Sequence, residues 1–88
     1  MSIKAYVMIE ARAGWSDDVI AQISGLPNVK SAEPIIGPYD GIADVEAADL
    51  DALGVLIGEI NAIEGIIKTI TSIRMKSFPR SSPRIEKG

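Results

Sequence analysis

The sequence contains no cysteine and no histidine, and only 5% of its residues are aromatic. Without cysteine and histidine the chain has no thiolate nucleophile, no disulfide, no Ser-His-Asp triad and no ordinary zinc or haem site. Its apolar runs are far shorter than the ~20 residues that a membrane-spanning helix needs. The N-terminal residues carry a single lysine before Glu10, so we expect no signal peptide. These absences predict a cytoplasmic protein without a metal, a cofactor or a membrane partner.

The charge of the 88-residue chain is distributed unevenly. Residues 1–73 carry four basic and eleven acidic side chains (−7), and residues 74–88 carry five basic and one acidic (+4). Because an acidic body repels phosphate backbones, we expect no direct nucleic-acid binding by the folded part. A chain of this length forms one domain with a modest core. We therefore predict a folded domain over 1–76 and a flexible basic tail, rich in proline and serine, over 77–88.

Short runs of strand-forming residues alternate with two segments of helical spacing. Strands are predicted over 4–11, 29–36, 42–47 and 66–75, and helices over 16–24 and from Asp49 to just before Gly65. Ser16 and Asp49 are the expected helix N-caps. This β-α-β-β-α-β order with right-handed crossovers predicts an α+β, ferredoxin-like plait, in which a four-stranded antiparallel sheet carries two helices on one face.

The first strand is apolar on both faces, with Ala5, Val7 and Ile9 on one side and Tyr6 and Met8 on the other. An antiparallel sheet with one face in water is polar on that face. We therefore expect the second face to pack on another copy of the chain as a two-fold dimer, giving a dimeric α+β barrel. The alternative is a monomer with scattered exposed aliphatic residues.

Two further patterns concern packing. In the last strand, Ile66 and Ile70 are expected to share one face. In the second helix, Gly54 and Gly58 lie one turn apart, and each costs about 1 kcal/mol relative to alanine. We expect close packing of that helix face against another backbone to compensate.

The turn between the second and third strands is the best candidate for a binding site. Gly37 and Gly41 are expected to leave backbone N–H groups accessible to a small carboxylate. Asp40 offers a counter-charge for an ammonium group, and Tyr39 adds a flat apolar wall. The alternative is a tight hairpin in which Asp40 bonds its own backbone.

Thr69 and Thr71 fall on one face of the last strand, where their hydroxyls can donate or accept hydrogen bonds. Together with the turn they predict a site for a zwitterion such as a free amino acid. No catalytic residue is predicted, because the serines lack an activating base. Asp44 and Glu46 lie two residues apart in the third strand. This spacing is the ordinary one for acidic side chains on the solvent-facing side of a strand, so it does not indicate a catalytic carboxylate pair.

The order and spacing of several short motifs resemble the effector-binding (RAM) domain of the Lrp/AsnC family of regulators over about residues 3–75. The matching positions are Gly37-x-Tyr39-Asp40, Val45, Asp49, Leu53, Ile60, Ile63, Gly65-Ile66, Thr69-x-Thr71 and Ile73. The resemblance implies a ferredoxin-like fold that dimerises through its sheet and assembles into octamers or decamers.

The resemblance also implies that a small effector, usually an amino acid, binds in a cleft between neighbouring dimers. By position, its contacts come from Gly37, Tyr39, Asp40 and Gly41, with Thr69 and Thr71 from the last strand. This sequence starts directly at the first strand, so we expect a stand-alone form without the family's helix-turn-helix. We expect such a form to modulate transcription by mixing with a full-length regulator, without binding DNA itself.

Two other functions fit the same pattern. A cofactor-independent monooxygenase or isomerase of the dimeric α+β barrel type has the same plait, although the side-chain inventory disfavours catalysis. A purely structural interaction protein would have a collapsed loop and no cleft. We therefore expect a sensing module and not an enzyme.

Overall fold

The computed structural model describes residues 2–75, and the tail predicted over 77–88 lies outside the described residues. The chain forms strands and helices in the predicted order. They are β1 (Ile3–Ala11), α1 (Ser16–Ser24), β2 (Val29–Pro34), β3 (Gly41–Ala47), α2 (Leu50–Asn61) and β4 (Ile66–Ile73). The predicted strands over 29–36 and 66–75 are therefore each two residues too long at the C-terminal end.

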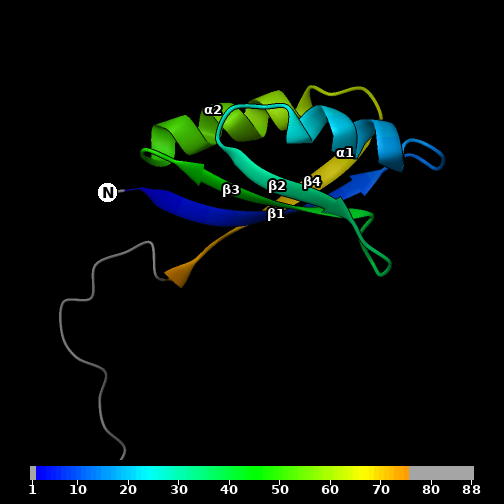
Figure 1. Ribbon diagram of the computed structural model, residues 1–88, viewed down its shortest axis with the longest axis horizontal. Helices are drawn as coiled ribbons and strands as arrows, with labels where there is room; N and C mark the ends of the chain where they lie inside the picture. The colour runs from blue at the N-terminus through cyan, green and yellow to red at the C-terminus, as the bar shows by residue number, and fades with distance from the viewer. Residues whose placement is uncertain (1, 76–88) are drawn as a thin grey trace, which may run out of the picture.

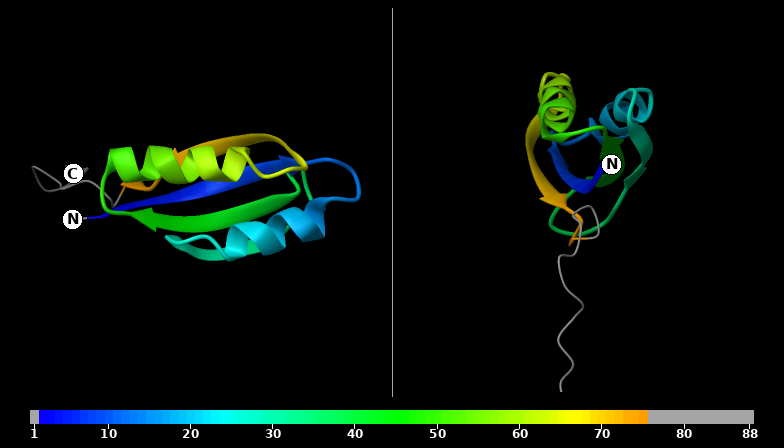
Figure 2. Two further views of the ribbon diagram at one scale, coloured as in Figure 1. Left: turned by 90° about the horizontal axis from the view of Figure 1, so that it is seen from above. Right: turned by 90° about the vertical axis from the view of Figure 1, so that its left-hand side faces the viewer.

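The four strands form one antiparallel sheet in the order β2-β3-β1-β4. Both helices cover the same face of this sheet, and the opposite face is left open (Figure 1). Seen along the strands, α1 and α2 lie side by side above a curved sheet (Figure 2). This arrangement confirms the predicted ferredoxin-like α+β fold.

The period-two alternation of the strands separates a buried face from the open one. On β1, Val7 and Ile9 are fully buried against the helices, whereas Tyr6 is 39% exposed on the open face. The core continues into α1 and α2 through residues of helical spacing. Its largest fully buried side chains are Ile9, Ile23, Leu56, Ile60, Val7, Val19 and Val45.

The two helices begin differently. Asp49 caps α2 as expected, because its side chain accepts a 2.8 Å hydrogen bond from the backbone N–H of Ala52. Ser16 was expected to cap α1, but Trp15 occupies the cap position and makes no side-chain cap bond. The negative side chains of Asp17 and Asp18 lie in the first turn of α1, where the helix dipole favours them.

The expectation that Ile66 and Ile70 share a face is wrong. Ile66 lies opposite Ala11 and packs against the core, whereas Ile70 lies opposite Met8 on the open face. The register between β1 and β4 shifts next to Ala11. An extra residue in one strand reverses the alternation beyond it, which sequence periodicity does not reveal.

The glycines of α2 are not packed against a backbone in this chain, contrary to expectation. A Cβ at Gly54 or Gly58 would meet no atom within 4 Å. Leu50 and Val55 on the same helix are also exposed. This helix surface is therefore open within the described chain.

Candidate functional site

Asp40 ties the loop between β2 and β3 to the end of β1. Its backbone N–H donates to the carbonyl oxygen of Ile9 (2.8 Å), and its own carbonyl oxygen accepts from the N–H of Ile35 (3.0 Å). Its carboxylate Oδ2 accepts a 2.8 Å hydrogen bond from the N–H of Ala11. The side chain therefore bonds a neighbouring strand, not its own backbone, and one carboxylate oxygen is already used in holding the loop.

The two glycines of the predicted site have different surroundings. Gly41 is buried as the first residue of β3. A Cβ there would overlap Cδ1 of Ile20 on α1 and would lie 3.3 Å from the carbonyl oxygen of Glu33. Gly37 is exposed, with no atom within 4 Å of a Cβ position. Gly41 therefore leaves room for Ile20 of α1 to pack against β3. Of the two glycines, only Gly37 offers open space to a ligand.

Thr69 and Thr71 lie on the helix-facing side of β4, opposite Ile9 and Val7 of β1. Gly41 is paired with Ile9 from the other side. Gly41 and Thr69 are therefore two strand spacings apart, about 10 Å. The hydroxyl of Thr69 donates to Oδ1 of Asn61 on α2 (3.0 Å).

The six predicted site residues therefore gather toward one end of the sheet in two groups. The loop, with half-buried Tyr39, lies beyond the end of β1. The threonines lie on the helix-facing side of β4, where the hydroxyl of Thr69 bonds Asn61 of α2. Within one chain the structure does not join the two groups in a single pocket, and their role in binding stays a prediction.

A hollow that the sequence did not predict lies on the open face of the sheet. It measures about 160 Å³ and is lined by Tyr6, Ser31, Glu33, Ile42 and Asp44. These residues come from three neighbouring strands and include two carboxylates and two hydroxyl groups. The alternation of polar and apolar residues in β3 is visible in the sequence. The cross-strand register, which brings these residues of three strands together, is not.

Charged side chains flank this hollow on the same face. Ser2 donates a hydrogen bond to Glu46, which also forms a 3.5 Å ion pair with Lys30. The hydrogen bond from Ser2 is the largest cause that holds the pKa of Glu46 below its ordinary value. Desolvation comes second and opposes it, and the positive charges of Lys30 and Lys4 lower the pKa further. Arg74 lies over Tyr6, with its Cζ 5.6 Å from the ring centroid.

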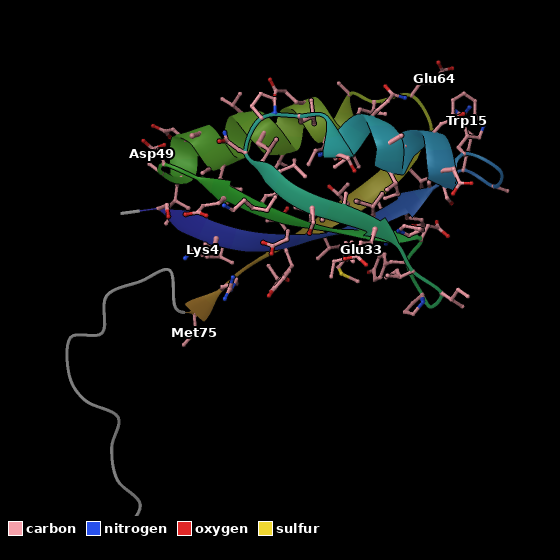
Figure 3. The ribbon with its side chains drawn as sticks, viewed as in Figure 1. Lys4, Trp15, Glu33, Asp49, Glu64 and Met75 are labelled. Carbon is pink, nitrogen blue, oxygen red and sulfur yellow. The ribbon has the colours of Figure 1, made fainter. Side chains whose placement is uncertain are left out.

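Figure 3 shows Lys4 and Glu33 far apart along the sheet, both on the side away from the helices. Among residues 2–75, no group of three or more acidic side chains is placed to hold a metal ion. In the same part of the chain, neither helix is long and apolar enough to cross a membrane.

A four-stranded plait with two helices on one face defines the ferredoxin-like class of folds, which by itself assigns no function. The sequence profile of the Lrp/AsnC ligand binding domain matches residues 4–83. The chain belongs to this family.

Solved structures support the assignment. A protein of Thermus thermophilus, TTHA0845, is 30% identical, with a TM-score of 0.81 over 89% of this chain and 99% of that one. AsnC of E. coli is 26% identical, with a TM-score of 0.76 over 96% of this chain and 56% of that one. The feast or famine regulatory protein of M. tuberculosis, solved with L-methionine, shares the fold at 22% identity, with a TM-score of 0.74 over 96% of this chain and 57% of that one.

An enzyme also contains a related segment. Homocitrate synthase of Sulfurisphaera tokodaii is 32% identical over 78 residues, which are 88% of this chain. The chain spans only 17% of that protein's length. A segment similar to this chain is therefore a small part of a much longer protein.

Proposed function

We propose that this domain senses a free amino acid or a closely similar metabolite, and that it acts as a homo-oligomer. The observation that carries the proposal is the match to the Lrp/AsnC ligand binding domain over nearly all of the described chain. The L-methionine in the related M. tuberculosis regulator supports an amino acid as the class of effector.

The assembly we propose is a dimer that packs through the open sheet face and joins further dimers into an octamer or decamer. Apolar side chains on that face support it. Tyr6 and Ile70 are 39% and 41% exposed there, beside half-buried Met8 and Ile42. Burying such a patch is the usual reason for an exposed apolar surface on a small domain.

The effector site we propose lies between neighbouring dimers and uses Gly37, Tyr39, Asp40, Gly41, Thr69 and Thr71. A site shared between subunits is consistent with the separation of the loop from the threonines within one chain. The free carboxylate oxygen of Asp40 faces the effector's ammonium group, and the exposed backbone at Gly37 faces its carboxylate. Gly41 contributes by letting Ile20 hold the strand in place.

Thermal unfolding against each of the twenty amino acids tests this proposal. A ligand at about 100 times its Kd raises the free energy of unfolding by about 2.7 kcal/mol. Light scattering in the same solutions reports whether the ligand changes the assembly. If no amino acid at millimolar concentration shifts the midpoint, amino-acid sensing is wrong.

The variant that isolates the charge of Asp40 is Asp40→Asn. The asparagine side chain keeps an oxygen that accepts from the Ala11 N–H, but it has no charge for an ammonium group. We expect Asp40→Asn to lose the ligand-induced shift while unfolding near the wild-type temperature without ligand. Asp40→Ala loses the hydrogen bond as well as the charge. It therefore does not separate the role of the charge in binding from the role of the hydrogen bond in holding the loop. An unchanged shift in Asp40→Asn would remove the charge of Asp40 from the site.

The regulated partner we propose is a full-length Lrp/AsnC-type regulator, with which this chain forms mixed assemblies without binding DNA. The match to part of homocitrate synthase favours a second candidate, in which the domain reports effector levels to an enzyme. Adding the purified chain to a full-length regulator and measuring DNA retardation, with and without effector, tests the first. An effect on the turnover of an enzyme carrying a related domain, but not on DNA retardation, supports the second.

A further inference from the structure

The side of α2 that points away from the sheet is acidic and partly apolar, and nothing among residues 2–75 covers it. Asp51, Gly54, Val55 and Gly58 follow one another at the i, i+3, i+4 and i+7 positions of one helix side, and Glu59 borders them. Val55 is 64% exposed, and a Cβ at either glycine would meet no atom within 4 Å. We call these five residues the outer face of α2.

The outer face carries negative charge that the described chain does not balance. From Asp49 to Glu64 the sequence has four acidic side chains and no lysine or arginine. Asp51 and Glu59 are exposed, and among residues 2–75 neither of them forms an ion pair. Residues 76–88, which follow the described part of the chain, carry four basic side chains and one acidic one (+3). Charge complementarity therefore favours these C-terminal residues as the occupant of the outer face.

The described chain ends at the same end of the molecule at which α2 begins. The backbone N–H of Arg74 donates to the carbonyl oxygen of Lys4 (2.8 Å), and Lys4 is paired with Glu46 of β3, three residues before Asp49. Figure 3 shows Asp49 and Met75 at this end, with Met75 on the side away from the helices. Residues that follow Met75 therefore have to pass the edge of the sheet before they meet a helix.

α2 is the helix that such a path meets first. β4 is an edge strand, and the hydroxyl of Thr69 in β4 bonds Asn61 of α2. α1 packs over β2 at the opposite edge (Figure 2). Five residues of extended chain, from Met75 to Arg80, span about 17 Å, whereas packed layers of secondary structure lie about 10 Å apart. This length is sufficient to bring Arg80 around the β4 edge to the first turn of α2.

The spacing of the basic residues matches the spacing of the acidic ones. Asp51 and Glu59 are eight residues apart, which is about 12 Å along a helix. Arg80 and Arg84 are four residues apart, and a proline precedes each of them. Proline favours an extended backbone of about 3.1 Å per residue, so the two arginines are also about 12 Å apart. Both charge pairs can therefore form at once.

We propose that residues 76–88 dock on the outer face of α2 of their own chain, with Arg80 beside Asp51 and Arg84 beside Glu59. The segment runs along α2 from the N-terminal to the C-terminal end of the helix. The inference is independent of the proposed effector and of the proposed assembly.

Apolar contacts accompany the charge pairs. Phe78 precedes the first arginine by two residues and falls beside Leu50, which is 56% exposed at the start of α2. The backbone between the arginines passes over Gly54 and Gly58, where no side chain stands in its path. Two glycines one turn apart on an exposed helix permit this close approach of a second backbone.

Disulfide trapping tests the docking, because the chain has no cysteine of its own. Ser82 lies midway between the arginines, and Val55 lies midway between Asp51 and Glu59. In the full chain with Val55→Cys and Ser82→Cys, mild oxidation should form an intramolecular disulfide, seen as a faster monomer band on a non-reducing gel. In the matched control, Gln22→Cys replaces Val55→Cys and places the thiol on an exposed position of α1. The control should close about tenfold more slowly, since an undocked segment offers only its effective concentration.

The closure rates need a correction for thiol reactivity. Each rate is divided by the reaction rates of the corresponding single-cysteine variants with a small neutral disulfide, because neighbouring charges alter the thiolate fraction.

Charge reversal distinguishes docking from chance collision. In the Val55→Cys, Ser82→Cys chain, Glu59→Lys or Arg84→Glu alone should slow closure by about threefold, and the two together should restore it, because the pair forms again with its charges exchanged. Asp17→Lys makes the same charge change on an exposed position of α1 and should leave the rate unchanged. Salt at about 1 M, which shortens the screening length to about 3 Å, should slow closure in the same way as a reversal.

Each outcome supports or overturns the docking. Fast intramolecular closure that responds to both reversals supports it. Equal corrected rates with the thiol on α1 and on α2, or rates that ignore both reversals, overturn it. A disulfide that forms between chains, seen as a dimer band, overturns docking within one chain. Glu59→Gln and Arg84→Gln replace the reversals if either variant fails to fold. No effector is present in these measurements, so a negative result leaves the proposed function untouched.

Discussion

Gly65 lies directly against the indole ring of Trp15, at the point where the chain turns from α2 into β4. The φ angle of Gly65 is +100°, and a Cβ at this position would lie 2.7 Å from Cε3 of Trp15. The carbonyl oxygen of Gly65 accepts a 2.8 Å hydrogen bond from the N–H of Arg12. The guanidinium of Arg12 in turn lies 5.7 Å from the centroid of the Trp15 ring. This contact joins the start of α1 to the end of α2.

Gly65→Ala should lower the free energy of unfolding by about 2–5 kcal/mol. A left-handed conformation costs an L-residue about 1–2 kcal/mol, and overpacking against Trp15 adds about 1–3 kcal/mol. Urea unfolding at one fixed protein concentration, followed by tryptophan fluorescence, measures the change. Gly54→Ala is the matched control, because its Cβ meets no atom and alanine favours the helix; it should raise stability by about 0.5–1 kcal/mol. Equal effects of the two substitutions would contradict the role of Trp15.

Gly41→Ala should lower the free energy of unfolding by about 1–3 kcal/mol, because its Cβ overlaps Cδ1 of buried Ile20. Ile20→Val removes that atom and alone should cost about 0.5–1.5 kcal/mol. The double variant should lose less than the sum of the two, since each change relieves the other. Strict additivity in this double-mutant cycle would show that the two side chains do not compete for space.

Asp49→Ala should cost about 1 kcal/mol through loss of the hydrogen bond to the N–H of Ala52. Asp49→Asn keeps an acceptor and should lose only a few tenths of a kcal/mol. Asp51→Ala, in the first turn of the same helix, removes a charge without removing the cap and serves as the control. Chemical denaturation measures the free energies of unfolding of the three variants. An Asp49→Ala variant as stable as the wild type would contradict the capping role of Asp49.

Ser2→Ala should raise the pKa of Glu46 toward its ordinary value of 4.5, because the hydrogen bond from Ser2 is the largest cause of its lowered pKa. A carboxyl whose pKa is lowered by folding contributes stability above the unfolded pKa. That contribution is lost as the pH falls from about 4.5 through the folded pKa. Carboxyl carbon NMR titration measures the shift, and Ser31→Ala is a control on the same face. An identical Glu46 pKa in wild type and Ser2→Ala would show that the hydrogen bond has no influence.

Local signals were sufficient to predict much of the fold. The helix predicted over 16–24 matches α1 at Ser16–Ser24, and Asp49 caps α2 as predicted. What failed depended on contacts between distant residues. The register shift beside Ala11 moved Ile66 to the buried face, and nothing in the local sequence indicates it.

The candidate site was harder to predict for the same reason. Gly41 was expected to expose its backbone, but a residue of α1, Ile20, occupies the space beside it. The sequence allows Asp40 either to bind a ligand or to bond its own backbone in a tight turn, whereas in the structure its carboxylate bonds the N–H of Ala11 on another strand. The hollow beside Glu33 requires three strands in register. Each of these features is set by tertiary pairing, which a pattern along one chain does not encode.

The anchoring of the β2–β3 loop has a consequence for which residues the loop constrains. The backbone N–H of Asp40 bonds the carbonyl oxygen of Ile9, and the carboxylate of Asp40 accepts from the backbone N–H of Ala11. Backbone groups are present whatever side chain a residue carries. These bonds therefore constrain the side chain of Asp40 but make no demand on the side chains of Ile9 and Ala11.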